Sequence, residues 1–202
     1  MNAERSALPV VEVDLGQGVR AAFTTRAGGV SSGTYATLNL GLNVADEPGR
    51  VLANRRLVER WSGGPVQFAT QVHGVAVAIV GPDLPPGSTP VSVGEFDALA
   101  SASGAAIAVL VADCVPVLLA DPSAGVVGPA ICGACYEVPA ELRAEVVAVV
   151  QASWSTTSWG TPALDLPAGV AATLAAAGVH RIDDLGICTA TDERFFSHRA
   201  QR

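Results

Sequence analysis

The sequence predicts an α/β (α+β) fold in which mixed β-sheets are flanked by helices. Short β-branched or apolar runs of strand length recur along the 202 residues, and helical patterns lie between them. No internal repeat relates one part of the chain to another, so a solenoid or a propeller is not expected. The length favours a single domain over residues 1–202.

Strands are predicted where short runs alternate between apolar and polar residues or are rich in β-branched ones. In chain order these runs are 10–15, 19–25, 66–72, 75–80, 105–111, 115–119 and 185–188. His73-Gly74 separates one pair of strands, and Ala112-Asp113-Cys114 separates another. The runs 105–111 and 115–119 are apolar, so both strands are expected to be buried.

Three helices are predicted between the strands. The first starts at Asp46-Glu47-Pro48, where acidic residues and a proline favour a helix start, and ends at about Trp61. The second spans 137–152, with one face formed by Val138, Leu142, Val146 and Val149. The third spans 167–177, and Gly178 follows it as the C′ glycine.

Three further segments read as turns and loops. The glycines of 27–33 permit positive φ angles and predict a turn. Proline and glycine predict a loop over 81–90, and a polar loop over 153–162 holds Trp154 and Trp159.

The charge of the chain excludes several classes of protein. Nineteen acidic residues against 12 basic ones give a net charge of −7, which argues against nucleic acid and against an anionic membrane surface as partners. All 12 basic residues are arginine. Without lysine, the chain has no Schiff-base lysine, no Walker A lysine and no kinase ion pair.

The apolar segments do not predict membrane insertion or secretion. The run Ala105–Ala120 contains Asp113 and Pro116 and is shorter than the roughly 20 residues of a spanning helix. The N-terminal stretch lacks the apolar core of a signal peptide. We therefore expect a cytoplasmic protein with free thiols at the four cysteines, which are Cys114, Cys132, Cys135 and Cys188.

His73 and Cys114 form the main candidate site. Gly74 lets the chain bend beside the histidine, and Pro116 takes the chain out of regular strand pairing just after the cysteine. Imidazole and thiolate are good Zn²⁺ ligands, and a catalytic zinc commonly has three protein ligands and one open position. The pair could equally be a cysteine nucleophile with its base, or a buried cysteine and an unrelated histidine.

Other candidate groups give weaker signals. The CxxC of Cys132 and Cys135 could be half of a zinc site or a redox pair, although no second CxxC accompanies it. Arg26, beside the glycine-rich turn, could bind an anion or lie on the surface. His198 could reach a site or belong to a solvated tail, and His180 fits a helix end or the surface.

An ordered set of short motifs covers nearly the whole chain. In the first half it comprises Phe23-Thr24-Thr25-Arg26, Gly28-Gly29-Val30-Ser31, Asn39-Leu40, Asn54-Arg55, Gln71-Val72-His73-Gly74, Asp97-Ala98-Leu99 and Ala112-Asp113-Cys114-Val115-Pro116. In the second half it comprises Gly128-Pro129-Ala130-Ile131, Cys135-Tyr136-Glu137-Val138, Leu164-Asp165-Leu166, Gly178-Val179, Cys188-Thr189 and Phe195-Phe196-Ser197-His198-Arg199. Together the motifs resemble the YfiH-like laccase-domain family, also described as multicopper polyphenol oxidase or purine nucleoside phosphorylase.

The resemblance implies an enzyme that cleaves adenosine, inosine or methylthioadenosine with phosphate, and adenosine deamination is also assigned to the family. It implies a metal, zinc or possibly copper, held by two histidines and a cysteine, of which His73 and Cys114 match two. It also implies substrate-binding roles for Arg26, Asn39 and Arg199, and a monomer or homodimer. Three histidines cannot ligate a multicopper cluster, so composition argues against the oxidase label.

The third ligand of the family is a histidine that opens a His-Ala-Gly-Trp-Arg-Gly stretch, and this chain lacks that stretch. Gly128 is followed directly by Pro129, where the family has a helix and more chain. Either this is a shortened member or a segment is missing at 128/129. Motifs that resemble the family lie on both sides of this junction, which favours a missing segment. A shortened member that keeps the fold without catalysis is the alternative.

Overall fold

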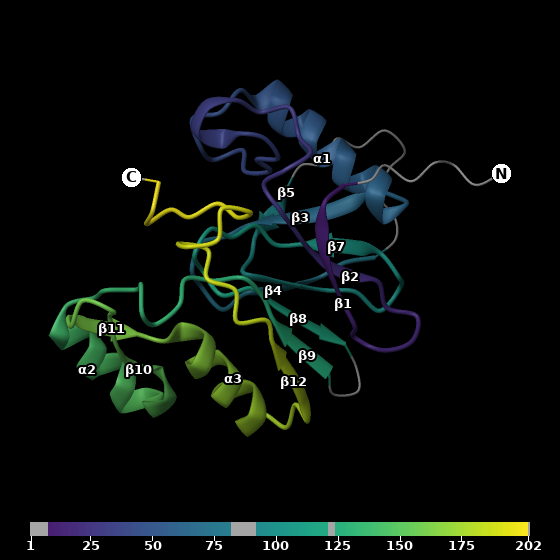
Figure 1. Ribbon diagram of the computed structural model, residues 1–202. Coiled ribbons are helices and arrows are strands. Elements are labelled where there is room, and N and C mark those ends of the chain that lie inside the picture. The colour runs from purple at the N-terminus through teal and green to yellow at the C-terminus, as the bar shows by residue number, and fades with distance from the viewer. Residues whose placement is uncertain (1–7, 82–91, 121–123, 202) are drawn as a thin grey trace. The chain divides into compact units, whose positions relative to one another are not determined.

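The computed structural model describes residues 8–81, 92–120 and 124–201, which form two compact units. Of the described residues, 8–9, 26–81 and 92–110 belong to unit 1, and 10–25, 111–120 and 124–201 belong to unit 2. Figure 1 labels their helices and strands. The organisation as a single domain stays a prediction.

The described residues of unit 1 form one long helix and two small parallel sheets. Its elements are η1 (Gly33–Tyr35), α1 (Pro48–Ser62), β3 (Val66–Thr70), β4 (Val77–Ile79), β5 (Ser92–Glu95), β6 (Ala98–Ala100) and β7 (Ala106–Ala108). The strand order is β5-β3-β7 in one sheet and β4-β6 in the other, and all these pairs are parallel. The central strand β3 is mostly buried, and α1 contacts it. The guanidinium of Arg55 on α1 lies 4.3 Å from the ring centroid of Phe68 on β3.

The ends of α1 follow from its sequence. Pro48 occupies the first turn, where its missing N–H costs no hydrogen bond. Gly63 ends the helix with φ 92°, a left-handed conformation in which glycine has no steric penalty. The predicted limits are therefore confirmed within a residue or two.

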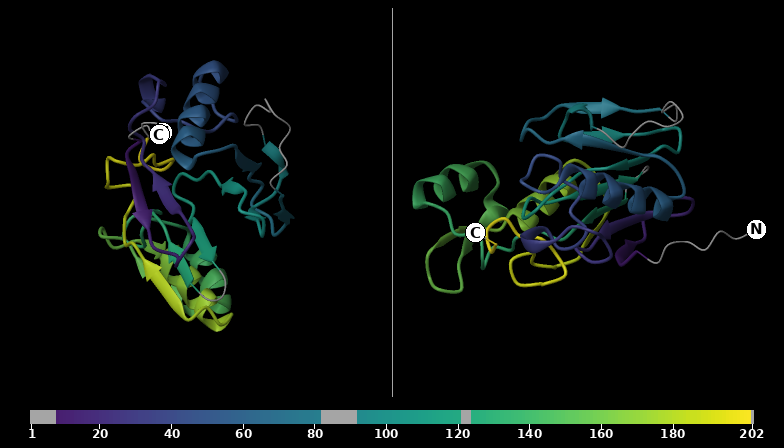
Figure 2. Two further views of the ribbon diagram at one scale, coloured as in Figure 1. Left: turned by 90° about the vertical axis from the view of Figure 1, so that its right-hand side faces the viewer. Right: turned by 90° about the horizontal axis from the view of Figure 1, so that it is seen from above.

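In its described residues, unit 2 has two separate two-stranded sheets, a mixed three-stranded sheet and two α-helices. Its elements are β1 (Val10–Val13), β2 (Ala21–Thr24), β8 (Val117–Ala120), β9 (Ala124–Val127), α2 (Ala140–Val149), η2 (Gln151–Ser153), β10 (Trp154–Thr156), β11 (Pro162–Leu164), α3 (Leu166–Ala176) and β12 (Arg181–Asp184). In the sheet β12-β9-β8 the central strand pairs parallel with β12 and antiparallel with β8. Figure 2 shows α3 beside this sheet from two further directions, and α3 contacts both β9 and β12.

The core of unit 2 lies around the end of β9. Val126, Val127 and Ile131 are almost completely buried. A Cβ on Gly128 would lie 2.2 Å from the Phe23 ring, so only glycine allows the chain to pass there without displacing the ring. The Gly128-Pro129 junction is thus closely packed in the 202-residue chain.

The predicted mixed α/β class is confirmed, and several details of the elements are wrong. The strands expected to be buried expose Ile107 and Leu119. The helix predicted over 137–152 is shorter, Ala140–Val149, and its predicted apolar face exposes Leu142 and Val149. The last strand lies at Arg181–Asp184 rather than at 185–188. This strand lies at the edge of its sheet, where charged residues are tolerated. Because most of its residues are charged, it lacks the apolar pattern from which strands were predicted.

The two loops predicted for 153–162 and 81–90 have different outcomes. The loop predicted for 153–162 is instead a hairpin of β10 and β11. The loop predicted for 81–90 falls almost entirely outside the described residues. Among the helices of the described residues, none is long and apolar enough to cross a membrane.

Candidate functional site

His73 lies on a loop of unit 1 that an aspartate holds from one side. The carboxylate of Asp97 accepts backbone N–H groups from Val72 at 3.3 Å, His73 at 2.9 Å and Gly74 at 2.7 Å. His73 itself has φ 57°, in the left-handed region that a non-glycine residue seldom adopts. The residue is exposed, so the loop holds an accessible histidine on a fixed backbone.

Asp113, the neighbour of Cys114, holds three segments of unit 2 together. Its carboxylate accepts the Thr189 hydroxyl at 2.6 Å and the Arg199 backbone N–H at 2.7 Å. Its carbonyl accepts the Ile131 N–H at 3.0 Å. Asp113 is 9% exposed and has φ 80°, so these contacts stabilise a backbone conformation that would otherwise be strained. Cys114 follows directly and is half-buried.

Arg199 is fixed at its backbone and along its side chain. Its guanidinium lies 5.1 Å from the Tyr136 ring centroid and donates to the carbonyl of Glu137 at 3.3 Å. The residue is exposed. It therefore combines a set position with the accessibility that binding an anion requires.

Arg26 and Asn39 lie on one loop system of unit 1. The Arg26 Nε donates to the carbonyl of Ala36 at 2.8 Å, and the Arg26 carbonyl accepts the N–H groups of Thr37 and Leu38. The Asn39 amide nitrogen donates to the Asp46 carboxylate at 2.9 Å. The structure thus uses Asn39 to hold the loop, and its role in binding substrate stays a prediction.

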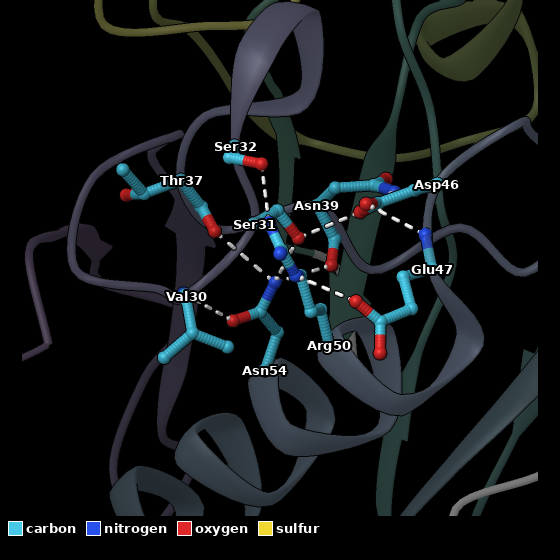
Figure 3. Close-up of polar contacts among 9 residues, drawn as sticks. All are labelled: Val30, Ser31, Ser32, Thr37, Asn39, Asp46, Glu47, Arg50 and Asn54. Carbon is cyan, nitrogen blue, oxygen red and sulfur yellow. Dashed lines mark hydrogen bonds and ion pairs between the residues drawn. The ribbon is translucent and has the colours of Figure 1, made fainter.

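Asn54 of α1 joins this loop to the helix, as Figure 3 shows. It is fully buried, and its amide oxygen accepts the Val30 N–H at 2.8 Å. Its amide nitrogen lies within hydrogen-bonding distance of three oxygens, those of the Ser31 hydroxyl and of the Thr37 and Asn39 carbonyls. The motif residue Asn54 therefore serves the architecture of the loop.

Asp46 completes the network at the start of α1. One carboxylate oxygen accepts from Ser31 at 2.6 Å and from Asn39, and the other accepts the Glu47 N–H at 2.8 Å. Burial opposes the charge, but the hydrogen bonds outweigh it and lower the pKa of Asp46. Arg50 adds ion pairing with Glu47 and contacts Ser32 (Figure 3).

A second cysteine group lies in unit 2. The Sγ atoms of Cys132, Cys135 and Cys188 all lie within 4.8 Å of one another. Burial, followed by interactions with the neighbouring thiols, raises the pKa of Cys135 to about 12 and also raises the pKa of Cys132. Burial also opposes ionisation of Cys188, yet hydrogen bonds from the Cys132 backbone and other neighbours lower its pKa.

The predicted site residues divide between the two units. His73, Arg26 and Asn39 belong to unit 1, and Cys114 and Arg199 belong to unit 2. A site shared by His73 and Cys114 stays a prediction. Sequence reasoning did not assign roles to Asp97 or Asn54, although both belong to family-like motifs. It also did not join Cys188 to the CxxC group, from whose Cys135 it is 53 positions away.

One protein family matches this chain over most of its length. A model described as multi-copper polyphenol oxidoreductase laccase matches residues 20–128 and 124–202. The chain belongs to this family. The expected resemblance is therefore confirmed over nearly all of its length.

Relatives in this family are named as purine nucleoside phosphorylases. The chain is 43% identical to "Purine nucleoside phosphorylase SCO2081" of Streptomyces coelicolor, over 94% of this chain and 93% of the relative. It is 38% identical to "Purine nucleoside phosphorylase Rv2149c" of Mycobacterium tuberculosis, over 90% and 86% of the two chains.

Solved structures confirm the YfiH-like fold. Neisseria meningitidis protein NMB0706 matches with a TM-score of 0.81 and 25% identity, over 95% of this chain and 93% of that one. YlmD from Geobacillus stearothermophilus matches with a TM-score of 0.78 and 28% identity, over 99% and 89%.

The alignments are longer than the chain. The alignment with the Streptomyces coelicolor relative runs over 229 positions and takes in 94% of the 202 residues, which is about 190 residues. About 39 of the 229 positions therefore have no residue in this chain. The family model matches in two pieces that meet at residues 124–128, next to Gly128-Pro129.

Proposed function

We propose that this protein is a purine nucleoside phosphorylase that takes adenosine, inosine or methylthioadenosine together with phosphate. The observation that carries the proposal is the identity of 36–43% to relatives of that name across nearly the whole chain. The fixed backbones at His73 and beside Cys114 support it, because a catalytic site needs side chains held in a set geometry. Adenosine deamination is a further activity to assay.

We propose that His73 and Cys114 hold a zinc ion. An exposed imidazole and a half-buried thiol are donors that suit Zn²⁺, so the residues present fit this ion. When bound, a zinc ion supplies Lewis-acid polarisation of a phosphate or water oxygen. The family description names copper, but the chain has three histidines, too few for a site with several coppers.

The remaining roles in the proposed reaction belong to arginines and phosphate. A phosphate oxygen forms a bond to C1′ of the ribose as the bond from C1′ to the purine nitrogen breaks. The purine leaves with the electron pair of that bond and takes up a proton. Arg26 and Arg199 would bind the phosphate or the substrate, since guanidinium forms strong hydrogen bonds to phosphate oxygens. Asn39 would support the loop that carries Arg26.

The third metal ligand is proposed to come from a segment at 128/129. The alignment positions without a residue in this chain and the two-piece family match support its absence from the 202-residue chain. A second candidate function therefore accompanies the first: a family member that keeps the fold but does not catalyse. For either candidate we propose a cytoplasmic location, which suits the four reduced cysteines.

One assay separates the two candidate functions. Phosphate-dependent release of hypoxanthine from inosine would be measured for the 202-residue chain and for a form with the segment of the Streptomyces coelicolor relative inserted between Gly128 and Pro129. Activity that appears only with the insertion supports the three-ligand phosphorylase. Activity in neither folded form favours the non-catalytic member. The intact mass of the protein from its natural source, compared with 20.4 kDa, shows which form exists there.

A further inference from the structure

We propose that Cys132, Cys135 and Cys188 form a second metal site, separate from the proposed site at His73 and Cys114, and that this second site binds Zn²⁺. The three Sγ atoms lie within 4.8 Å of one another. They come from two segments of unit 2 that are more than 50 residues apart in sequence. No role in the proposed phosphorylase reaction accounts for this convergence.

The separations suit one ion held by three thiolates. With Zn–S bonds of about 2.3 Å, two thiolates on a tetrahedral zinc lie about 3.8 Å apart. The observed limit of 4.8 Å exceeds this by an amount that small side-chain rotations can remove. Water or another small ligand would take the fourth position, because the group contains three side chains.

The backbone already holds the two segments in place. Cys132 and Cys135 flank a tight turn in which the Cys132 carbonyl accepts the N–H groups of Cys135 and Tyr136, both at 3.0 Å. Ala130 pairs with Cys188 in a parallel bridge, through bonds to the neighbouring Ile187 and Thr189. The ligands are therefore positioned by main-chain hydrogen bonds before any ion binds.

A hydrogen bond within the group also favours a thiolate. The Cys132 N–H points at the Cys188 Sγ at 3.4 Å, an arrangement that stabilises negative charge on sulfur. Three thiolates this close repel one another unless a cation lies between them. A soft or borderline-soft metal ion is the natural partner of such a group, and Zn²⁺ is a common one.

The proposed ion would stabilise the surroundings of Cys114. It would join the segment around Ile131, whose N–H donates to the Asp113 carbonyl, to the segment of Thr189, whose hydroxyl donates to the Asp113 carboxylate. Both segments meet at the residue that precedes Cys114. A structural role is therefore more consistent with the geometry than a direct part in nucleoside cleavage.

Cobalt titration of the reduced full chain tests the proposal. The background is His73→Ala/Cys114→Ser, which removes the other proposed site and leaves three cysteines. Co²⁺ bound by thiolates gives intense sulfur-to-metal charge-transfer absorption. We expect one equivalent to bind with this band, to be displaced by Zn²⁺, and to bind at least about 100-fold more weakly after Cys132→Ser, Cys135→Ser or Cys188→Ser.

A second measurement needs no further variant, in case a serine substitution prevents folding. In the same background, Zn²⁺ should protect Cys132, Cys135 and Cys188 together from alkylation, as mapped by peptide mass. A folded, reduced background protein that binds no Co²⁺ and gains no protection would overturn the proposal. A disulfide between two of the three cysteines, in protein kept under thiol reductant, would also overturn it.

Discussion

The carboxylate of Asp97 accepts the backbone N–H of His73 at 2.9 Å, 24 residues away in sequence, while His73 holds a left-handed φ of 57°. The same carboxylate also binds the N–H groups of Val72 and Gly74. One acidic side chain thus sets the course of the loop that presents the histidine. A comparable arrangement exists in unit 2, where Asp113 binds Thr189 and Arg199 just before Cys114.

Replacing Asp97 should loosen the loop of His73. In Asp97→Ala the amides of His73 and Gly74 lose their acceptor, so their hydrogen exchange should accelerate, as measured by NMR or mass spectrometry. In a catalytically active form, kcat/KM should fall by about 10- to 100-fold, since the histidine is no longer positioned. The exposed Glu95 provides the control, and Glu95→Gln should leave both quantities near the wild-type values. Unchanged exchange at His73 in Asp97→Ala would contradict this role.

Asp113→Asn should lower the free energy of unfolding by about 2 kcal/mol, because charged hydrogen bonds to Thr189 and Arg199 are lost or weakened at a buried site. Urea unfolding measures the change. Asp183 is an exposed carboxylate of the same unit, 3.7 Å from Arg181, and Asp183→Asn should change stability by less than about 0.5 kcal/mol. Equal effects of the two substitutions would show that Asp113 does not hold the segments together.

Asn54→Leu should destabilise the protein by about 3 kcal/mol or more. Leucine fills a similar volume but leaves the Val30 N–H and the carbonyls of Thr37 and Asn39 without the side-chain partner that they have at a fully buried position. Arg56 is exposed on the same helix, so Arg56→Ala serves as the control and should stay within about 0.5 kcal/mol of the wild type. Chemical denaturation of both variants checks the difference, and a loss below about 1 kcal/mol for Asn54→Leu would contradict the account.

Because of Asp46, the free energy of unfolding should fall as the pH is lowered through the acid range. Its pKa is lowered in the folded state, so its contribution is fully present above the ordinary value of 3.8 and is lost as pH falls through the lower folded value. The wild type should therefore exceed Asp46→Asn in urea midpoint at pH 6, and the two should converge well below pH 3.8. Parallel pH profiles for the two proteins would refute a stabilising carboxylate at this position.

Local patterns predicted α1 well, because a proline start and a glycine stop act within a few residues. They failed for β12, whose Arg181, Asp183 and Asp184 carry no apolar period and which forms only by pairing with β9. The same limit applies to the sites. His73 and Cys114 could be proposed from residue type and resemblance, but the partnership of Cys188 with the CxxC pair depends on a parallel bridge to Ala130 that no local pattern predicts.

Phosphate-dependent release of hypoxanthine from inosine tests the central claim most directly, using the form that carries the segment between Gly128 and Pro129 and its Cys114→Ser variant. We predict that release requires phosphate, yields an equal amount of ribose 1-phosphate, and falls at least about 100-fold in the variant, since a serine hydroxyl is a poor zinc ligand beside a thiolate. Release without phosphate, or undiminished release by Cys114→Ser, would contradict the account.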